Sequence, residues 1–404
     1  DTRELRRSLR PSLPSKGLVH VSDGVVKIGF VGSGSALWGY LAALDRILST
    51  GHAKLGPICV RSAERRSAIL RQRPSAILVA TPAEVFASDA DIVVVLTPPA
   101  THAEVAAEAL RAGKHVLVEK PFAQSRSEGE ALAELATSRG LRLYASPFTL
   151  LSPTVRLMWT IARRDVGGIH STRALYGNSG STWADWYHTS GAGPFSDMAI
   201  YNLKTITAVC GPVREVTALE STAVGVREIN GELVASDPDV SHVILRHQSG
   251  ALSSVVSSQA IQRYRRVAIE LYGTEGTINL LGDDWAPRGL EVWRNATSSW
   301  AVHDALDETW TWADGLRELV DAIRSGTPPR GGIDHDLHLL DVIEAVRDAC
   351  AAHASAWVAS TFADPDLGLD AQPREVREMD DRGAAKNRFA SSVLNILAPC
   401  RGSA

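Results

Sequence analysis

Apolar residues recur along the chain with two different periods. Between residues 25 and 146, short β-branched runs alternate with stretches in which apolar residues recur every three or four positions. The short runs predict buried strands, and the longer stretches predict amphipathic helices. The pattern predicts strands at 25–31, 58–60, 92–97, 115–118 and 141–145, and helices at 37–48, 63–73, 101–112 and 126–139. Such regular alternation demands a parallel sheet with right-handed crossovers.

After Pro147 the chain changes to short strand-like runs joined by turn residues. Gln248-Ser249-Gly250 and residues 273–276 are typical of hairpin turns. The runs predict strands at 169–176, 213–222, 240–247, 251–259, 266–272 and 276–281, and helices at 153–164, 313–325 and 335–353. This half therefore predicts an antiparallel sheet in a second domain. No helix obviously covers that sheet, so we expect a second subunit to supply the missing layer.

Composition excludes several classes of protein. The chain has 404 residues, 45% of them hydrophobic and 22% charged, which are ordinary globular values. Its net charge of −4 offers no electrostatic surface for nucleic acid or an anionic membrane. No apolar run reaches the roughly 18 residues of a membrane span. The four cysteines stand far apart and the basic N-terminus lacks a signal-like apolar core, so we expect a reduced, cytoplasmic protein.

A glycine-rich turn joins the first predicted strand to the first predicted helix. Gly32 permits a tight turn, and Gly34 lets the backbone approach a pyrophosphate at the helix N-terminus. The third glycine of the G-x-G-x-x-G pattern is replaced by Leu37. In this strand–turn–helix context the turn predicts a dinucleotide site. The predicted contacts are Gly32, Ser33, Gly34, Ser35, Ala36 and Leu37.

The end of the second strand bears on the choice between NAD and NADP. An NAD site places Asp or Glu there to bind the ribose, but this chain has Arg61 and Ser62 instead. Together with Arg65 they could hold a 2′-phosphate, which favours NADP over NAD. The alternative is that Arg61 and Arg65 are solvated charges at an exposed helix start.

Two further strand ends carry polar residues at the same predicted edge of the sheet, where ligands bind in such folds. Glu119 and Lys120 follow a buried strand, and a lysine beside a nicotinamide can hold a substrate hydroxyl. His102 could touch the cofactor, although Thr101 and its neighbours could equally form a capped helix start. The predicted cofactor contacts here are Thr97, Pro98, Pro99, His102, Glu119 and Lys120.

The second half carries an acid and a phenol at helical spacing. Asp197 and Tyr201 are i and i+4, so on a helix both face one way and suit proton transfer at a carbinol oxygen. The alternative is a capped helix with a buried tyrosine. Trp183, Trp186 and Tyr187 could stack on a sugar ring, or could belong to a core or an interface.

No metal site is predicted anywhere in the chain. His335 and His338 have the spacing of ligands on one helical face, but no obvious third ligand accompanies them. Asp334 as a helix N-cap accounts for this stretch better.

These motifs together resemble the family of glucose–fructose oxidoreductase, inositol dehydrogenase and rhizopine-catabolism proteins. The resemblance rests on the turn at 32–34, the Ala112–Pro121 stretch with Glu119-Lys120-Pro121, and the Gly191–Tyr201 stretch, and it runs from about residue 25 to 362. It implies an α/β fold with an N-terminal Rossmann dinucleotide-binding domain. A C-terminal α/β domain with a large, open, mostly antiparallel sheet would follow. The expected divisions are a flexible leader 1–24, domains 25–148 and 149–362, and a tail 363–404.

The resemblance also implies hydride transfer at a secondary alcohol or ketone of a sugar, glycoside or cyclitol. Lys120 matches the family's catalytic lysine, and Asp197 its second-motif aspartate, with Tyr201 where a histidine is usual. The chain departs from the family's pattern at three further positions. Lys204 stands where the family has an aspartate, Ala199 where it has a glycine, and Leu150 where an arginine is often found.

The expected cofactor is therefore NADP or NAD, and the partners are a small sugar-like substrate and a second copy of the chain. The C-terminal sheet would form the interface of a homodimer or homotetramer. Two rival functions stay open. One is glycoside cleavage by transient oxidation and elimination, and the other is a non-catalytic dinucleotide sensor. Fold alone does not decide between them.

Overall fold

The computed structural model describes residues 24–182, 184–189, 193–264, 267–305, 307, 309–365, 367 and the backbone of 377–379. The leader up to residue 23, Trp183, the start of the Gly191 motif and most of the expected tail lie outside the described residues. The chain forms two compact units. Unit 1 comprises Asp1–Phe148 with Trp312–Glu344, and unit 2 comprises Thr149–Thr311 with Ala345–Ala404.

Unit 1 contains a six-stranded, all-parallel sheet in the order β3-β2-β1-β4-β5-β6. This is the doubly wound order of a dinucleotide-binding domain, so the expected Rossmann fold is confirmed. Its strands are β1 (Val26–Val31), β2 (Ala53–Cys59), β3 (Leu78–Val79), β4 (Ile92–Val95), β5 (His115–Val118) and β6 (Leu143–Ala145). Its helices are α1 (Ser35–Leu48), α2 (Ala63–Gln72), α3 (Pro82–Phe86), η1 (Pro99–Thr101), α4 (His102–Arg111), α5 (Arg126–Ser138) and α9 (Gly315–Ser325).

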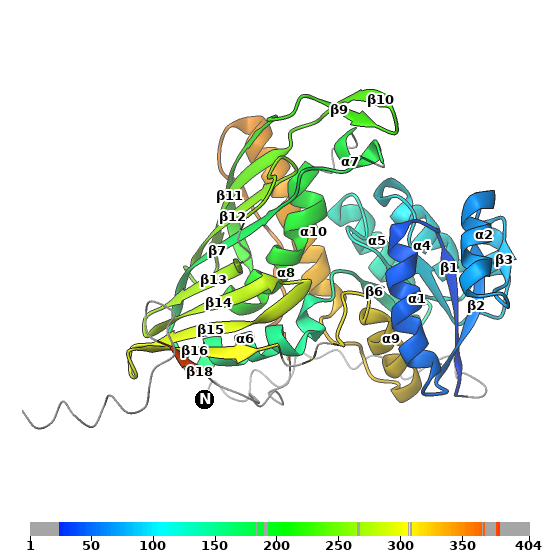
Figure 1. The fold of residues 1–404 in the computed structure, drawn as a ribbon, viewed down its shortest axis with the longest axis horizontal. Helices are drawn as coiled ribbons and strands as arrows, with labels where there is room; N and C mark the ends of the chain where they lie inside the picture. Colours follow the sequence, from blue (N-terminus) through cyan, green and yellow to red (C-terminus); the bar gives the residue numbers. More distant parts are fainter. Residues whose placement is uncertain are drawn as a thin grey trace, which may run out of the picture. The chain divides into compact units, whose positions relative to one another are not determined.

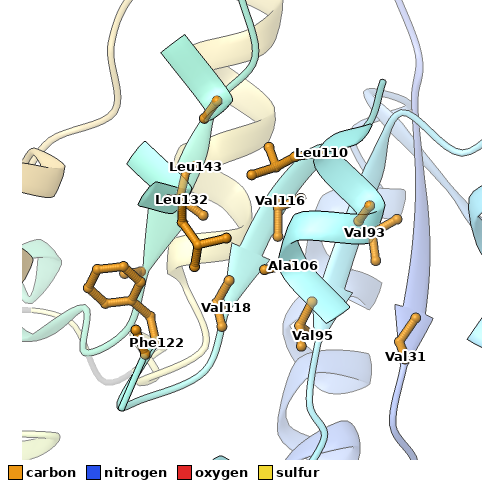
Figure 2. Packing of buried hydrophobic residues seen from close by; sticks show 14 of the residues in the cluster. Val31, Val93, Val95, Ala106, Leu110, Val116, Val118, Phe122, Leu132 and Leu143 are labelled. Atoms are coloured by element: carbon orange, nitrogen blue, oxygen red, sulfur yellow. The ribbon is translucent and has the colours of Figure 1, made fainter. Parts of the chain in front are cut away.

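Strands β4 and β5 of unit 1 are buried along their whole length, as the apolar runs at 92–96 and 116–118 predict. Val93 and Val95 of β4 pack with Val116 and Val118 of β5 (Figure 2). Leu110 of α4 belongs to the same cluster, so helices cover this face of the sheet. The burial fixes the carboxyl ends of β4 and β5, which carry the residues predicted to bind the cofactor.

One strand of unit 1 is longer than the sequence predicts, and two short elements of this unit were not predicted. Strand β2 begins at Ala53 rather than near residue 58. Gly56 and Pro57 disguised it, because they break the apolar run at a shift in the pairing between β1 and β2. The missed elements are β3 and α3. A capping box formed by Thr81 and Glu84 precedes α3, but the helix is too short to show a period.

Unit 2 contains a ten-stranded sheet in the order β17-β8-β11-β12-β7-β13-β14-β15-β16-β18. Every pairing is antiparallel except that of β12 with β7, so the expected mostly antiparallel sheet is confirmed. The strands are β7 (Ile169–Gly177), β8 (Val213–Ser221), β11 (Val240–His247), β12 (Leu252–Ser258), β13 (Val267–Gly273), β14 (Gly276–Asp283), β15 (Ala286–Arg294), β16 (Ser299–Asp304), β17 (Ala356–Trp357) and β18 (Arg377–Met379). A separate hairpin consists of β9 (Val226–Ile229) and β10 (Glu232–Ala235).

Helices cover one face of this sheet, so the expectation of a sheet without a covering helix was wrong. Helix α6 packs on β14 and β15, and α8 packs on β7 and β13 (Figure 1). The indole Nε1 of Trp159 donates a hydrogen bond of 3.1 Å to the carbonyl of Ala208 and so joins the two helices. Helix α6 precedes both strands that it covers, and α8 lies between β7 and β13 in the sequence, so neither role was evident from the order of elements. The helices are η2 (Thr149–Leu151), α6 (Pro153–Arg164), α7 (Trp186–Thr189), the π-helical turn η3 (Phe195–Ala199) and α8 (Ile200–Cys210).

Helix α10 (Ile333–Ala352) gives its first part to unit 1 and its last part to unit 2. Asp334 lies inside its first turn, so the expectation that Asp334 caps the helix was wrong. Within the described part of the chain, no helix has the length and apolar character needed to cross a bilayer.

Candidate functional site

The two glycines of the turn between β1 and α1 meet different demands. Gly32 has a φ of +110°, and a Cβ there would lie 2.4 Å from the carbonyl oxygen of Leu96. Gly34 has a φ of −72°, and a Cβ there would meet nothing within 4 Å. The fold thus requires glycine at 32, whereas nothing in the described part of unit 1 requires it at 34. The N-cap position of α1 is Gly34 and no side chain among the described residues caps it, so the N–H groups of the first turn suit a phosphate.

Arginine and serine side chains surround the tip of β2. Ser62 is the N-cap of α2, where its Oγ accepts a hydrogen bond of 3.3 Å from the backbone N–H of Arg65. The guanidinium of Arg65 donates a bond of 3.1 Å to the carbonyl of Ser33 in the glycine turn. Arg65 is therefore more than a solvated charge, although it and Arg61 are both exposed.

The loop after β4 is closely connected to the loop after β5. His102 is 1% exposed, and its ring nitrogens lie 2.8 Å from the carbonyl oxygen of Pro121 and 2.7 Å from that of Thr97. Thr101 precedes α4, but its hydroxyl bonds to Thr97 and Pro98 and does not cap the helix. His102 therefore links the two loops through both of its nitrogens.

Glu119 is held by a residue that the sequence analysis missed. Its carboxylate is buried, with Oε1 accepting a 2.7 Å hydrogen bond from the hydroxyl of Tyr40 and Oε2 a 3.1 Å bond from the backbone N–H of Lys120. Tyr40 is fully buried in α1 and packs edge-on against Trp312. Tyr40 continues the apolar face of α1, three positions after Leu37, and this was the available signal.

In unit 2 the predicted acid lies in an unusual turn. Asp197 is 5% exposed and belongs to η3, a π-helical turn that leads into α8, where Tyr201 is half-buried. Such turns occur often at functional sites. Burial raises the pKa of Tyr187 well above its ordinary value, and the neighbouring Asp197, to which its hydroxyl bonds, adds to the rise. Trp186 packs edge-on against Tyr187. The structure thus brings Tyr187 and Asp197 together.

Further buried carboxylates of unit 2 escaped the sequence analysis. Asp284 is fully buried, and burial raises its pKa to about 7, although hydrogen bonds from Thr205 and Asn202 oppose the rise. The neighbouring Asp283 accepts a bond of 3.2 Å from the hydroxyl of Tyr264. The only signal in the sequence was a pair of aspartates at the end of an apolar strand.

No group of three or more His, Cys, Asp or Glu side chains suited to a metal occurs among the described residues. A nicotinamide dinucleotide, by contrast, fits the residues that are present. The open position at Gly34 and the uncapped first turn of α1 suit a pyrophosphate at the strand edge.

Comparison with known families agrees with this geometry. Residues 26–146 match the model of an oxidoreductase family with an NAD-binding Rossmann fold, and residues 156–279 match that of the GFO/IDH/MocA C-terminal domain. A relative from Streptomyces antibioticus, dTDP-3,4-didehydro-2,6-dideoxy-alpha-D-glucose 3-reductase, is 31% identical over 249 residues, which cover 59% of this chain and 71% of the relative. The chain belongs to the GFO/IDH/MocA family.

Other members of the GFO/IDH/MocA family are named for related chemistry. Trans-1,2-dihydrobenzene-1,2-diol dehydrogenase of Sus scrofa is 26% identical over 59% of this chain and 71% of its own length. Levoglucosan dehydrogenase of Pseudarthrobacter phenanthrenivorans is 27% identical over 47% of this chain and 55% of its own length. A solved levoglucosan dehydrogenase in complex with NADH and L-sorbose has a TM-score of 0.73 and 19% identity, covering 83% of this chain and 99% of that one. The chain is thus an enzyme of an NAD-binding, sugar- or polyol-type oxidoreductase family.

Proposed function

We propose that the chain is an NAD(P)-dependent dehydrogenase or reductase that acts on a secondary alcohol or ketone of a sugar, glycoside or cyclitol. The observation that carries this proposal is the Glu119–Lys120 pair, held at the carboxyl end of a buried strand of a dinucleotide-binding sheet. Named relatives act on a dihydrodiol and on levoglucosan, both of which carry ring hydroxyls.

The proposed mechanism assigns three residues to the proton at the reacting oxygen. Lys120 holds the substrate oxygen, and its ammonium lowers the pKa of the bound hydroxyl. Tyr201 exchanges the proton with that oxygen, and Asp197 orients the groups. When it is bound, a nicotinamide dinucleotide supplies the acceptor or donor of the hydride. The backbone of Gly32–Leu37 and the loop residues Thr97, Pro98 and Pro99 would hold it, whereas Trp186 and Tyr187 would contact the sugar ring.

We propose that NADP binds more tightly than NAD. The end of β2 offers no carboxylate to a ribose 2′-hydroxyl, while Arg61 and Arg65 could neutralise a 2′-phosphate beside the glycine turn. Calorimetric titration of the protein with NADP⁺ and with NAD⁺ tests this preference. Tighter binding of NAD⁺ would overturn it.

The test of the function is a search for turnover. We expect NAD(P)H to accumulate when the protein is supplied with NADP⁺ or NAD⁺ and a panel of neutral polyols that includes levoglucosan, cis-diols and inositols. With an active polyol, Tyr201→Phe keeps the ring and removes only the hydroxyl, so we expect kcat to fall about 100-fold. No turnover with any member of the panel, in either direction, would contradict the proposal.

A further inference from the structure

One buried side chain, His102 at the start of α4, joins the loops that follow β4 and β5. Its Nδ1 lies 2.8 Å from the carbonyl oxygen of Pro121, and its Nε2 lies 2.7 Å from the carbonyl oxygen of Thr97. Both distances are those of hydrogen bonds, and the ring is 1% exposed. One imidazole therefore bridges the two loops.

Both partners of His102 are carbonyl oxygens, which can only accept hydrogen bonds. A neutral imidazole carries one N–H, so it could satisfy one carbonyl and would turn a lone pair towards the other. Only the doubly protonated ring donates to Thr97 and to Pro121 at once. Another buried histidine, His247, shows the contrast. His247 faces a carbonyl on one side and the hydroxyl of Ser253 on the other, and a neutral ring satisfies both.

Burial lowers the pKa of the His102 ring and is the largest influence on it. The two carbonyl contacts and the Glu119 carboxylate act in the opposite direction, while the Lys120 ammonium adds to the lowering. A neutral ring would place a lone pair 2.8 Å from the buried carbonyl oxygen of Pro121 or 2.7 Å from the carbonyl oxygen of Thr97, and this repulsion favours the charged ring.

Lys120 lies between two residues that are held from opposite sides. On its N-terminal side, Glu119 accepts hydrogen bonds from Tyr40 and from the Lys120 backbone N–H. On its C-terminal side, the Pro121 carbonyl bonds to His102. Helices α1 and α4 thus both restrain the backbone that carries the Lys120 side chain.

We propose that His102 is a positioning residue, an imidazolium that holds the carbonyls of Thr97 and Pro121 and thereby fixes Lys120. The inference rests on the proposed role of Lys120 as the group that holds the reacting oxygen. In this role His102 does not contact the substrate. It holds the two loops instead of making the cofactor contact that the sequence predicts for it.

Nitrogen NMR of the full chain labelled with ¹⁵N-histidine tests the charge. At neutral pH we expect both ring nitrogens of His102, assigned by comparison with His102→Gln, to have the chemical shift of protonated nitrogens. His115 is the internal reference. Burial lowers its pKa to about 4, and its Nδ1 accepts a hydrogen bond from the Arg142 backbone, so one of its nitrogens should be unprotonated. An unprotonated ring nitrogen in His102, as expected for His115, would show that the His102 ring is neutral and would overturn the proposal.

Kinetics of His102→Gln test the positioning role. We expect kcat with an active polyol to fall about tenfold or more, while the Kd of NADPH changes less than about threefold. His115→Gln, at the opposite end of β5, is the matched control and should keep the wild-type kcat. A His102→Gln variant with unchanged kcat, or with equal losses in kcat and cofactor affinity, would overturn the role. The NMR experiment needs no substrate, so failure of the wild type on the polyol panel would count against the proposed function alone.

Discussion

The two ends of β5 each carry a lysine, and only one of them lies at the edge proposed to bind ligands. Lys120 follows the carboxyl end of the strand, whereas Lys114 precedes its amino end and donates a 2.6 Å hydrogen bond to the carbonyl of Ser88. The structure therefore offers a matched pair of substitutions on a single strand.

Replacing Lys120 by Ala should lower kcat about 100-fold or more, because the group that holds the reacting oxygen is removed. The Kd of NADP(H) should stay nearly unchanged, since the backbone of the glycine turn is untouched. Steady-state kinetics and calorimetry measure the two quantities. Lys114→Ala should behave as the wild type, and a Lys120→Ala enzyme that keeps most of its kcat would refute the assignment.

Among the elements, the turn between β1 and α1 contains one glycine that the fold requires, Gly32, and one that we expect the ligand to require, Gly34. At Gly32 a Cβ would meet the backbone of Leu96, whereas at Gly34 it would meet nothing within 4 Å. Gly32→Ala should therefore lower the melting temperature. Gly34→Ala should melt close to the wild type but bind the dinucleotide at least about tenfold more weakly, because the pyrophosphate must approach this backbone. Equal effects of the two substitutions on melting and on the calorimetric Kd would contradict this division.

Most elements were predictable because their apolar period was long and unbroken. Strands β4, β5 and β11 and helices α5 and α6 lie within two residues of the predicted bounds. The failures have local causes. In β2 the pair Gly56-Pro57 interrupts the pattern, and β15 and β16 were not predicted because their stretch has mixed polarity.

The candidate site was predictable where its residues follow one another in sequence, as in the glycine turn and the Glu119-Lys120 pair. Contacts between distant residues were not. The bond from Tyr40 to Glu119 joins positions 79 residues apart, and the bond from Asn202 to Asp284 joins positions 82 apart. Neither spacing has a local signature, because the fold alone brings these residues together.

At the scale of the whole molecule, Asp284 should make the free energy of unfolding depend on pH. Its folded pKa of about 7 lies above the roughly 3.9 of an unfolded aspartate, so the native state binds one more proton in the interval. The contribution of Asp284 to the free energy of unfolding is fully present below about pH 4. It is lost as the pH rises through 7, by at most about 1.4 kcal/mol per pH unit. Urea unfolding between pH 5 and 8 should show a flatter dependence for Asp284→Asn, and identical slopes would contradict the assignment.

We also propose that the second face of the unit 2 sheet is an interface between copies of the chain. Leu219, Ile244 and Leu252 lie on neighbouring strands and are 71%, 46% and 41% exposed. Light scattering should show a dimer or tetramer at micromolar concentration, and Ile244→Glu should weaken it. Leu233→Glu is the control, because Leu233 is 78% exposed on the separate hairpin. A wild-type monomer would exclude this interface.

The return of the chain to unit 1 at Trp312 has a consequence for biosynthesis. A Cβ on Gly39 would lie 2.4 Å from the Trp312 ring, Arg46 of α1 pairs with Asp314, and Leu340 belongs to the same apolar cluster as β4 and β5. A ribosome makes all of unit 2 up to Thr311 before these partners emerge. The dinucleotide-binding unit therefore cannot complete its packing on a nascent chain that stops at residue 148, because such a fragment lacks the Trp312 ring that packs against Tyr40.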